Sequence, residues 1–90
     1  MKIVWDENKA ASNLKRHRVS FVSAVDVLSD DVAITIEDID HEEQRFVTIG
    51  IDMECRLLVV VCCYPDKTTI RIISVRRAEQ LERKQYENRS

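Results

Sequence analysis

The chain is poor in glycine and proline, with one of each among 90 residues. Because these two residues dominate turns and loops, their scarcity excludes a loop-rich or low-complexity chain and indicates helices and strands joined by short connections. Long apolar runs are also absent: the longest, residues 57–64, is far shorter than the ~20 residues that cross a bilayer. The start of the chain has no apolar run typical of a signal peptide. We therefore expect a soluble, cytoplasmic protein that does not contact membranes.

Cysteine is scarce as well, with Cys55, Cys62 and Cys63. An odd count with an adjacent pair excludes a disulfide framework. Neighbouring residues of a strand face opposite sides, so Cys62 and Cys63 cannot hold one metal ion, and no Cys-x-x-Cys or His-x-x-x-His spacing accompanies them. We predict free, reduced thiols that act as small core hydrophobes, and neither a metal nor another cofactor.

Composition predicts one globular domain over residues 1–90, since 44% of the chain is apolar and 33% is charged. The net charge of −2 is unevenly distributed. Residues 31–66 contain two basic and nine acidic side chains, whereas residues 67–90 contain seven basic and three acidic ones. This pattern argues against non-specific coating of nucleic acid and indicates an acidic domain with one cationic groove.

Hydrophobic periodicity predicts eight elements. We expect strands at 2–5, 32–37, 45–51, 56–63 and 69–75, a helix from the cap Asp6 to about His17, a second helix after Ser20 and a last helix ending near Tyr86. The resulting order, β-α-α-β-β-β-β-α, predicts an α+β fold in which four antiparallel strands form a meander and helices pack on one face. The Leu- and Val-rich run at 56–63 is typical of a central strand covered on both faces. Ala78 and Leu81 are expected on one side of the last helix.

The stretch from Thr68 to Tyr86 is the one around which the chain is organised. Strict alternation puts Arg71, Ile73 and Val75 on one face of a strand. An arginine in an apolar strand needs an anion or a carboxylate, because burying an unpaired charge is costly. Arg71 and Arg76 are therefore expected either to bind a phosphate or to pair with acidic groups of the same chain.

Several short motifs occur in order along the chain. They are Trp5-Asp6-Glu7-Asn8-Lys9, Asn13-Leu14-Lys15-Arg16-His17, Val19-Ser20-Phe21, Glu43 with Arg45, Ile70-Arg71-Ile72-Ile73-Ser74, Arg76 with Ala78, and Glu82-Arg83 with Tyr86. In this combination the chain resembles the BrnT family, the toxins of type II toxin–antitoxin systems whose partner is the BrnA antitoxin. Two departures are Arg18, where a Gly usually follows the His, and Val75, where the family has Ala. The first affects the turn between the helices, since Gly tolerates positive φ and Arg does not readily.

The resemblance implies a RelE/ParE-like fold with a mainly antiparallel sheet. It also implies a metal-independent endoribonuclease that cleaves RNA and inhibits translation. A BrnA-like antitoxin would neutralise the toxin and repress the operon, so this chain would meet DNA only indirectly, through the antitoxin. Both a homodimer and a heterotetramer with the antitoxin are compatible with this resemblance.

Metal-independent RNA cleavage needs a group that takes a proton, a group that gives one, and cations that hold the developing charge. His17 is the candidate acid or base, because its ordinary pKa lies near neutrality. Arg71 and Arg76 are candidates for a phosphate clamp, with Arg45 as a third. Glu43 is a candidate for orienting an arginine or for acting as the base.

Further RNA contacts are expected from Lys9, Lys15, Arg77, Arg83 and Tyr86. Each role has a structural alternative: His17 can interact with the carbonyls that end its helix, Arg45 can pair with Glu43 or Glu37, and Tyr86 can be a packing residue. Trp5 is expected in the core and His41 in a solvated acidic connection.

Three functions are compatible with these residues. The first is a ribonuclease toxin. The second is a toxin-like module without activity that binds an antitoxin and co-represses the operon, as the acidic net charge and Arg18 favour. The third is a DNA-directed poison, because related folds target gyrase.

Overall fold

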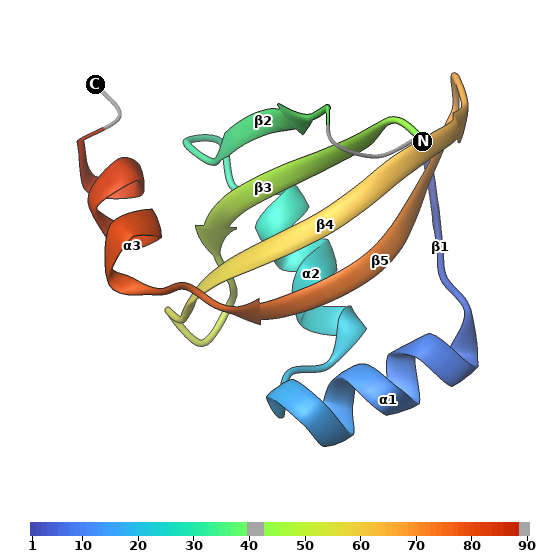
Figure 1. The fold of residues 1–90 in the computed structure, drawn as a ribbon, viewed down its shortest axis with the longest axis horizontal. Helices are drawn as coiled ribbons and strands as arrows, with labels where there is room; N and C mark the ends of the chain where they lie inside the picture. Colours follow the sequence, from blue (N-terminus) through green and yellow to red (C-terminus); the bar gives the residue numbers. More distant parts are fainter. Residues whose placement is uncertain (40–42, 89–90) are drawn as a thin grey trace.

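The computed structural model describes residues 1–39 and 43–88, which form an α+β fold (Figure 1). Its elements are β1 (Lys2–Val4), α1 (Glu7–His17), α2 (Phe21–Leu28), β2 (Ile34–Asp38), β3 (Arg45–Ile51), β4 (Leu57–Asp66), β5 (Thr69–Arg77) and α3 (Gln80–Glu87). This is the predicted order of elements. None of the described helices is long and apolar enough to cross a membrane. The prediction for His41 lies outside the described residues.

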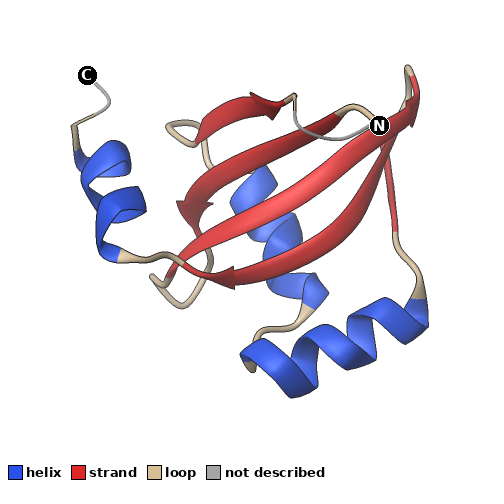
Figure 2. Ribbon diagram, in the orientation of Figure 1, coloured by secondary structure: helices blue, strands red, loops and turns tan. Residues whose placement is uncertain are grey.

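The strands form one sheet in the order β1-β5-β4-β3-β2 (Figure 2). Consecutive strands from β2 to β5 pair antiparallel, as the meander predicts. β1, however, joins β5 in parallel, so the sheet is mixed rather than mainly antiparallel. The two helices that follow β1 carry the chain to the opposite edge of the sheet. The apolar pattern of a three-residue strand does not indicate which strand it pairs with. β4 is the middle strand of the sheet, as predicted, and residues 57–60 of it are buried.

Each face of the sheet has its own apolar core. On one face α2 packs against β3, β4 and β5, and on the other face Tyr86 of α3 packs against β3 and β4. The first core contains Phe21, Ala24, Val27, Leu58, Val60, Ile72 and Val75, and the second contains Ile49, Leu57, Val59 and Tyr86. The helices therefore cover both faces, not one as expected.

The prediction that Ala78 and Leu81 lie on one side of the last helix is wrong, because Ala78 precedes the helix. Leu81 is 72% exposed, whereas Tyr86 is 6% exposed. Ala78 contacts the second core from the segment before the helix. The helix begins at Gln80, after a capping box formed by Glu79 and Glu82. This later start separates Ala78 from the helical repeat on which the prediction depended.

Helix α1 begins and ends at well-defined caps. The Asp6 carboxylate accepts hydrogen bonds from the backbone N–H groups of Asn8 (2.7 Å) and Lys9 (3.2 Å), which confirms the predicted cap. At the other end Arg18 has φ 60°, in the left-handed region. Its N–H donates to the Leu14 carbonyl at 2.9 Å. Arg18 thus occupies a position that favours glycine.

Asn13 fastens α1 to β5. β1 pairs only with residues 69–71 of β5, so the rest of this edge is open to α1. The Asn13 amide donates to the Val75 carbonyl (2.8 Å) and accepts from the Val75 N–H (3.1 Å), as a neighbouring strand would. It also donates to the Val19 carbonyl at 3.0 Å. One buried side chain therefore joins α1, the link to α2 and the open edge of β5.

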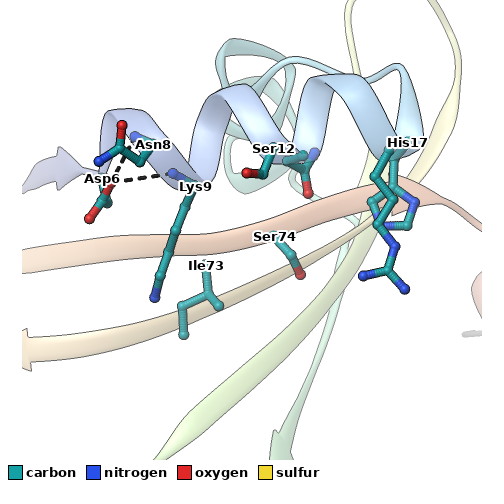
Figure 3. A pocket seen from close by; sticks show the side chains of 9 residues that line it. Asp6, Asn8, Lys9, Ser12, His17, Ile73 and Ser74 are labelled. Atoms are coloured by element: carbon teal, nitrogen blue, oxygen red, sulfur yellow. Dashed lines mark hydrogen bonds between the residues drawn. The ribbon is translucent and has the colours of Figure 1, made fainter.

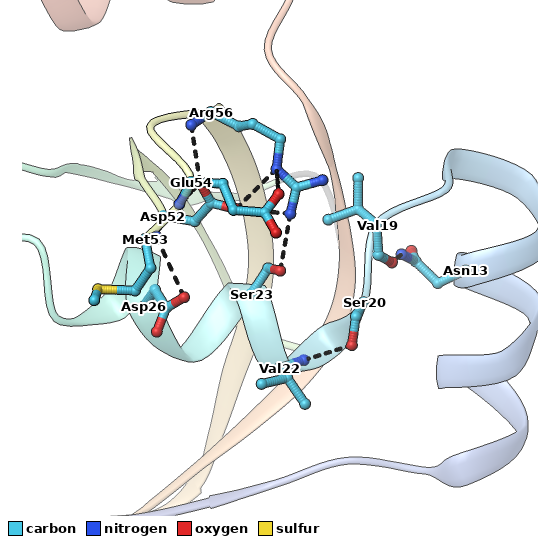
Figure 4. A network of polar contacts seen from close by, with 10 residues as sticks. All are labelled: Asn13, Val19, Ser20, Val22, Ser23, Asp26, Asp52, Met53, Glu54 and Arg56. Carbon is cyan, nitrogen blue, oxygen red and sulfur yellow. Dashed lines mark hydrogen bonds and ion pairs between the residues drawn. The ribbon is translucent and has the colours of Figure 1, made fainter.

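A polar network holds the turn between β3 and β4 against α2 (Figure 4). The Arg56 guanidinium donates to the buried Asp52 carboxylate (Nε to Oδ2, 2.9 Å) and to the Ser23 hydroxyl (3.1 Å). Asp52 also accepts from the backbone N–H groups of Glu54 and Arg56, which closes the turn. The Met53 N–H donates to the Asp26 carboxylate of α2 at 3.4 Å. These contacts stabilise the packing of the turn between β3 and β4 against α2.

The three thiols are free, as predicted. Cys62 and Cys63 are buried on opposite faces of β4. Cys55 is exposed and has φ 63°, so the prediction that it is a core residue is wrong. It lies in the short turn after β3, where the backbone cannot enter the core.

Replacing Asn13 with Ala should lower the free energy of unfolding by about 2–4 kcal/mol, because three backbone groups lose their partner in a buried place. Urea denaturation measures this change. Asn8→Ala, on the exposed side of the same helix, is the matched control and should change stability little. Equal stability of the two variants would contradict the role given to Asn13.

Replacing Arg18 with Gly should raise the free energy of unfolding by about 0.5–1 kcal/mol, because the left-handed conformation is strained for a residue with a Cβ atom. Arg18→Ala separates this effect from the loss of charge, since it keeps the Cβ atom. Lys15→Gly, inside the same helix, should instead lower stability by about 1 kcal/mol. Thermal and urea unfolding of the three variants test the sign of each change.

Candidate functional site

A β-bulge at Ile73 changes the alternation of β5. The consecutive β4 residues Val61 and Cys62 pair with Ser74 and Ile72, respectively, so Ile73 is an extra residue without a partner on β4. Bulges of this kind re-aim side chains and are common beside functional sites. Nothing in a run of β-branched residues indicates where such a bulge lies.

As a result, Arg71, Ser74 and Arg76 lie on the same face of the sheet. The prediction that Arg71 and Val75 share a face is wrong, because Val75 belongs to the core beneath α2. The evidence is the pairing, in which the partners of Arg71, Ser74 and Arg76 are alternate residues of β4, namely Cys63, Val61 and Val59. This face is the one that α3 covers at its other end.

Three cations surround one carboxylate at the uncovered end of this face. We call Lys9, Arg45, Arg71 and Glu43 the cationic cluster. The largest effect that lowers the pKa of the Glu43 carboxyl is a hydrogen bond with the Cys63 thiol. The charges of Arg45, Arg71 and Lys9 lower this pKa further, so Glu43 is ionised at neutral pH. The sequence separates these residues widely, and the sheet brings them together.

Both arginines of the cluster retain free donors. Among the described residues, Arg45 Nε is buried and has no hydrogen-bond partner. Glu37, one of its expected partners, instead accepts a hydrogen bond from Gln44 at 2.9 Å. Arg71 is exposed and forms no salt bridge or side-chain hydrogen bond with any described residue. Because an unsatisfied buried donor costs about 1–3 kcal/mol, such a site favours the binding of an anion.

Cys63 lies beneath the cluster. It is buried, and it is directly opposite Arg71 in the pairing of β4 with β5. Burial is the main cause that raises the pKa of its thiol, which therefore stays protonated and can donate to Glu43. The sequence predicts a core hydrophobe at this position. Its place under the cluster follows from the register of the strands.

A cavity of about 340 Å³ separates α1 from β5 (Figure 3). Lys9 and His17 extend from α1 toward β5 at opposite ends of the cavity, and Ile73 and Ser74 lie between them. Ser12 and Arg16 also line it. His17 is half-buried here, so the end of α1 presents its imidazole to a cavity.

A second cavity of about 380 Å³ connects this region with the cationic cluster. It is lined by Arg71 and by Val4 and Trp5 near β1, and it shares Asp6 and Lys9 with the first cavity. His17 is eight positions after Lys9 in α1, which corresponds to about 12 Å along the helix. The two cavities adjoin at Asp6 and Lys9, and together we call them the groove; Lys9, Arg16 and Arg71 supply cations along it.

Arg16 belongs to this groove, and sequence analysis missed it. Lys15, which was predicted to bind RNA, is exposed and does not line either cavity. Lys9, Ser12 and Arg16 follow the spacing i, i+3, i+7 and so share one side of α1. This spacing is the signal that could have identified Arg16.

Arg76 is occupied by an ion pair with α3. Its guanidinium donates to both carboxylate oxygens of Glu82, at 2.8 and 2.6 Å. Arg76 is five positions after Arg71 in β5, so the two arginines lie roughly 16 Å apart along the strand and cannot clamp one phosphate together. Of the two expected alternatives, Arg76 has the carboxylate partner.

The remaining predicted RNA contacts lie away from the groove. Arg77 ends β5 and Arg83 is on α3; both are exposed, and neither lines the two cavities. Tyr86 is buried, and its hydroxyl donates to Asp30 at 2.8 Å. Its ring is part of the second core, so the packing alternative describes it, and it is not available for base stacking in this arrangement.

The two cavities are lined by cations, hydroxyls, amides, apolar side chains, the imidazole of His17 and the carboxylate of Asp6. The carboxylate of Glu43 lies beside Lys9 and Arg71 in the cationic cluster. Within residues 1–39 and 43–88, no group of three or more His, Cys, Asp or Glu side chains could hold a metal ion. The groove and the cationic cluster can therefore bind an anion, and the His17 imidazole and the Glu43 carboxylate are side chains of the types that act as general acids or bases.

Comparison with known proteins connects this groove to a family. Residues 5–82 match the family described as ribonuclease toxin, BrnT, of type II toxin-antitoxin systems. Among solved structures, the chain is similar to the crystal structure of the Brucella abortus ribonuclease toxin BrnT, with a TM-score of 0.71 and 27% sequence identity. The similarity covers 89% of this chain and 99% of that chain. No curated protein matches the chain.

The ion pair between Arg76 and Glu82 predicts a pH-dependent stability. Hydrogen bonds from Arg76 are the main cause that lowers the pKa of Glu82 below its ordinary 4.5. A lowered folded-state pKa means that this contribution is present above about pH 4.5 and is lost as the pH falls through the folded value. Glu82→Gln should therefore reduce the free energy of unfolding at pH 7 by roughly 1 kcal/mol, and by less in acid.

Urea denaturation at pH 7 and in acid measures this difference. Glu87→Gln, at the exposed end of the same helix, is the matched control and should have no effect at either pH. Arg76→Ala should be destabilised like Glu82→Gln, whereas Arg71→Ala should unfold like the parent. If Glu82→Gln lowered the free energy of unfolding by the same amount at both pH values, the inferred titration of the ion pair would be wrong.

Proposed function

Because the chain belongs to the family of BrnT ribonuclease toxins of type II toxin–antitoxin systems, we propose that it is an endoribonuclease that cleaves RNA without a metal ion. The scissile phosphate binds the cationic cluster. The observation that carries this proposal is the pair of arginines with free donors: Arg45, whose buried Nε has no partner among the described residues, and Arg71. An RNA phosphate satisfies both, because a guanidinium matches phosphate geometry.

The reaction consists of attack by the RNA 2′-OH on the adjacent phosphorus. The bond from O2′ to phosphorus forms, the bond from phosphorus to O5′ breaks, and the products are a 2′,3′-cyclic phosphate and a free 5′-OH. A base removes the proton of the 2′-OH, and an acid protonates the leaving O5′. Lys9, Arg45 and Arg71 stabilise the charge that develops on the phosphoryl oxygens.

We assign the proton transfers to His17 and the orientation of the arginines to Glu43. The lowered pKa of Glu43 makes it a weak base, and its carboxylate attracts Arg45 and Arg71 before RNA arrives. His17 faces the same groove from the end of α1, and an imidazole is the side chain that most often serves as a general acid or base. Arg16, beside His17, adds a cation for the next phosphate. In this assignment Arg76 positions α3 through Glu82 and does not contact the substrate.

Family membership also implies a protein antitoxin as partner. We propose that this partner is a BrnA-like protein, that the fold is of the RelE/ParE type, and that RNA cleavage inhibits translation. Operon DNA is then contacted through the antitoxin. The acidic net charge of −2 supports this division of roles, since the chain has local cationic surface rather than a generally basic one.

One observation favours a second function, a toxin-like module that binds the antitoxin and co-represses the operon without cleaving RNA. Arg76, one of two arginines expected to hold phosphate, is engaged by Glu82, which leaves fewer cations for catalysis. Growth arrest on expression distinguishes the two functions. An active toxin arrests growth and its Arg71→Ala variant does not, whereas an inactive module has no effect in either form.

Purified protein should cleave single-stranded RNA in EDTA and leave 2′,3′-cyclic phosphate ends. Arg71→Ala and Arg45→Ala should each lower the rate about 10²–10³-fold, as expected when a donor to a developing oxyanion is removed. His17→Ala should lower it about 10²–10⁴-fold, the contribution of general acid–base catalysis. Gel electrophoresis of end-labelled RNA measures each rate.

Lys15→Ala and Arg83→Ala are the controls, because both remove an exposed cation outside the groove and should cleave at nearly the parental rate. Intact RNA with the parent protein, free or with ribosomes, would refute the proposal. Equal losses in the control and groove variants would instead indicate a general effect of charge.

A further inference from the structure

We propose that the cavity between α1 and β5 is a nucleobase subsite, which holds one unpaired base of the RNA beside the phosphate bound by the cationic cluster. This inference rests on the proposed ribonuclease function and adds to it a source of sequence preference. The cavity shares Lys9 and Asp6 with the cavity that contains Arg71. A nucleotide whose phosphate lies at Arg71 therefore has its base within reach of this space.

The bulge in β5 supplies an apolar surface in the cavity. Ile73 has no partner on β4, and its half-buried side chain lines the cavity between α1 and the strand (Figure 3). Without the extra residue, strict alternation would turn the side chains at this point of β5 to other faces of the sheet. An apolar surface that excludes water suits the flat face of a base. The cavity volume of about 340 Å³ lies within the range of small-ligand pockets.

Polar groups with free hydrogen-bonding capacity surround this surface. Asn8, Ser12 and Ser74 line the cavity, and in the described part of the chain none of their side chains forms a hydrogen bond with another residue. An amide both donates and accepts, and hydroxyl groups do the same, so together they can match the edge of a base. Asn13, which also lines the cavity, is fully used by Val19 and Val75 and so acts as a fixed wall.

Arg16 provides a second surface for the base. It lines the cavity from the last turn of α1, and its guanidinium plane can stack on a base. Among the described residues that line this cavity, the imidazole of His17 is the one aromatic ring, so stacking falls to it and to the Arg16 guanidinium. A base can enter such a site only when it is unpaired, because its Watson–Crick edge and its face are both contacted. The subsite thus selects single-stranded RNA.

The four 2′-deoxy homodinucleotides test the subsite by binding, since they lack the 2′-OH and cannot be cleaved by it. Titration into ¹⁵N-labelled protein should shift the amide signals of Ser12, Ile73 and Ser74. The dissociation constants should differ roughly ten-fold between the best and the worst base, the discrimination that one good base-edge contact provides. Equal affinity for all four, or no base-dependent shift at Ile73 and Ser74, would overturn the inference.

Variants separate base from phosphate recognition. Asn8→Ala with Ser74→Ala should bring the four dissociation constants together, while Asn88→Ala, an exposed asparagine after α3, should keep the ranking of the parent. Arg71→Ala should weaken all four dinucleotides to the same extent and preserve the ranking. A ranking that survives Asn8→Ala with Ser74→Ala in a folded protein would also refute the subsite.

The two proposals fail separately. RNA cleavage without preference for any base would leave the ribonuclease function standing and refute the subsite. Base-selective binding without cleavage of any RNA would support the subsite and refute the endoribonuclease.

Discussion

The hydrogen bonds between Asn13 and Val75 determine how the groove is built. β1 covers only the first part of β5, so the backbone groups farther along this edge need another partner. A side-chain amide supplies both a donor and an acceptor, and one asparagine therefore replaces the missing strand. Because Asn13 lies in the middle of α1, this contact places the whole helix along β5. Lys9, Arg16 and His17 face β5 as a consequence.

The bulge at Ile73 also determines which side chains of β5 face the groove and the cationic cluster. It shifts β5 by one residue relative to β4, so that Arg71 and Arg76 face the same side although they are five positions apart, an odd number. The face of the sheet that carries Arg71 and Arg76 then has two ends with different roles. At one end the ion pair of Arg76 with Glu82 and the burial of Tyr86 hold α3 in place. The other end remains uncovered and carries the cationic cluster.

The distribution of charge explains how an acidic protein can act on an anionic polymer. The cations of the groove come from α1, β3 and β5, whereas most of the acidic residues lie in the segment 31–66. Glu43 belongs to this acidic segment but lies among the cations, and the charges of Arg45, Arg71 and Lys9 help to lower the pKa of its carboxyl. In the proposed function, a carboxylate in this place attracts the arginines before RNA binds. An RNA phosphate is likewise an anion whose two non-bridging oxygens match a guanidinium, so it can compete for the same donors.

By itself, the sequence determined the order of the elements, the central position of β4, the cap of α1 at Asp6, and the family. These depend on hydrophobic period, side-chain capping and ordered motifs, all of which act between residues close in the chain. The tertiary structure decided which charges meet: that Arg45 and Arg71 gather around Glu43, that Arg76 pairs with Glu82, that Tyr86 is buried, and that Arg16 rather than Lys15 lines the groove. The parallel pairing of β1 and the bulge at Ile73 were also decided there. The physical reason is that strand register and helix placement result from contacts between residues far apart in the chain, and a shift of one residue moves a side chain to the other face.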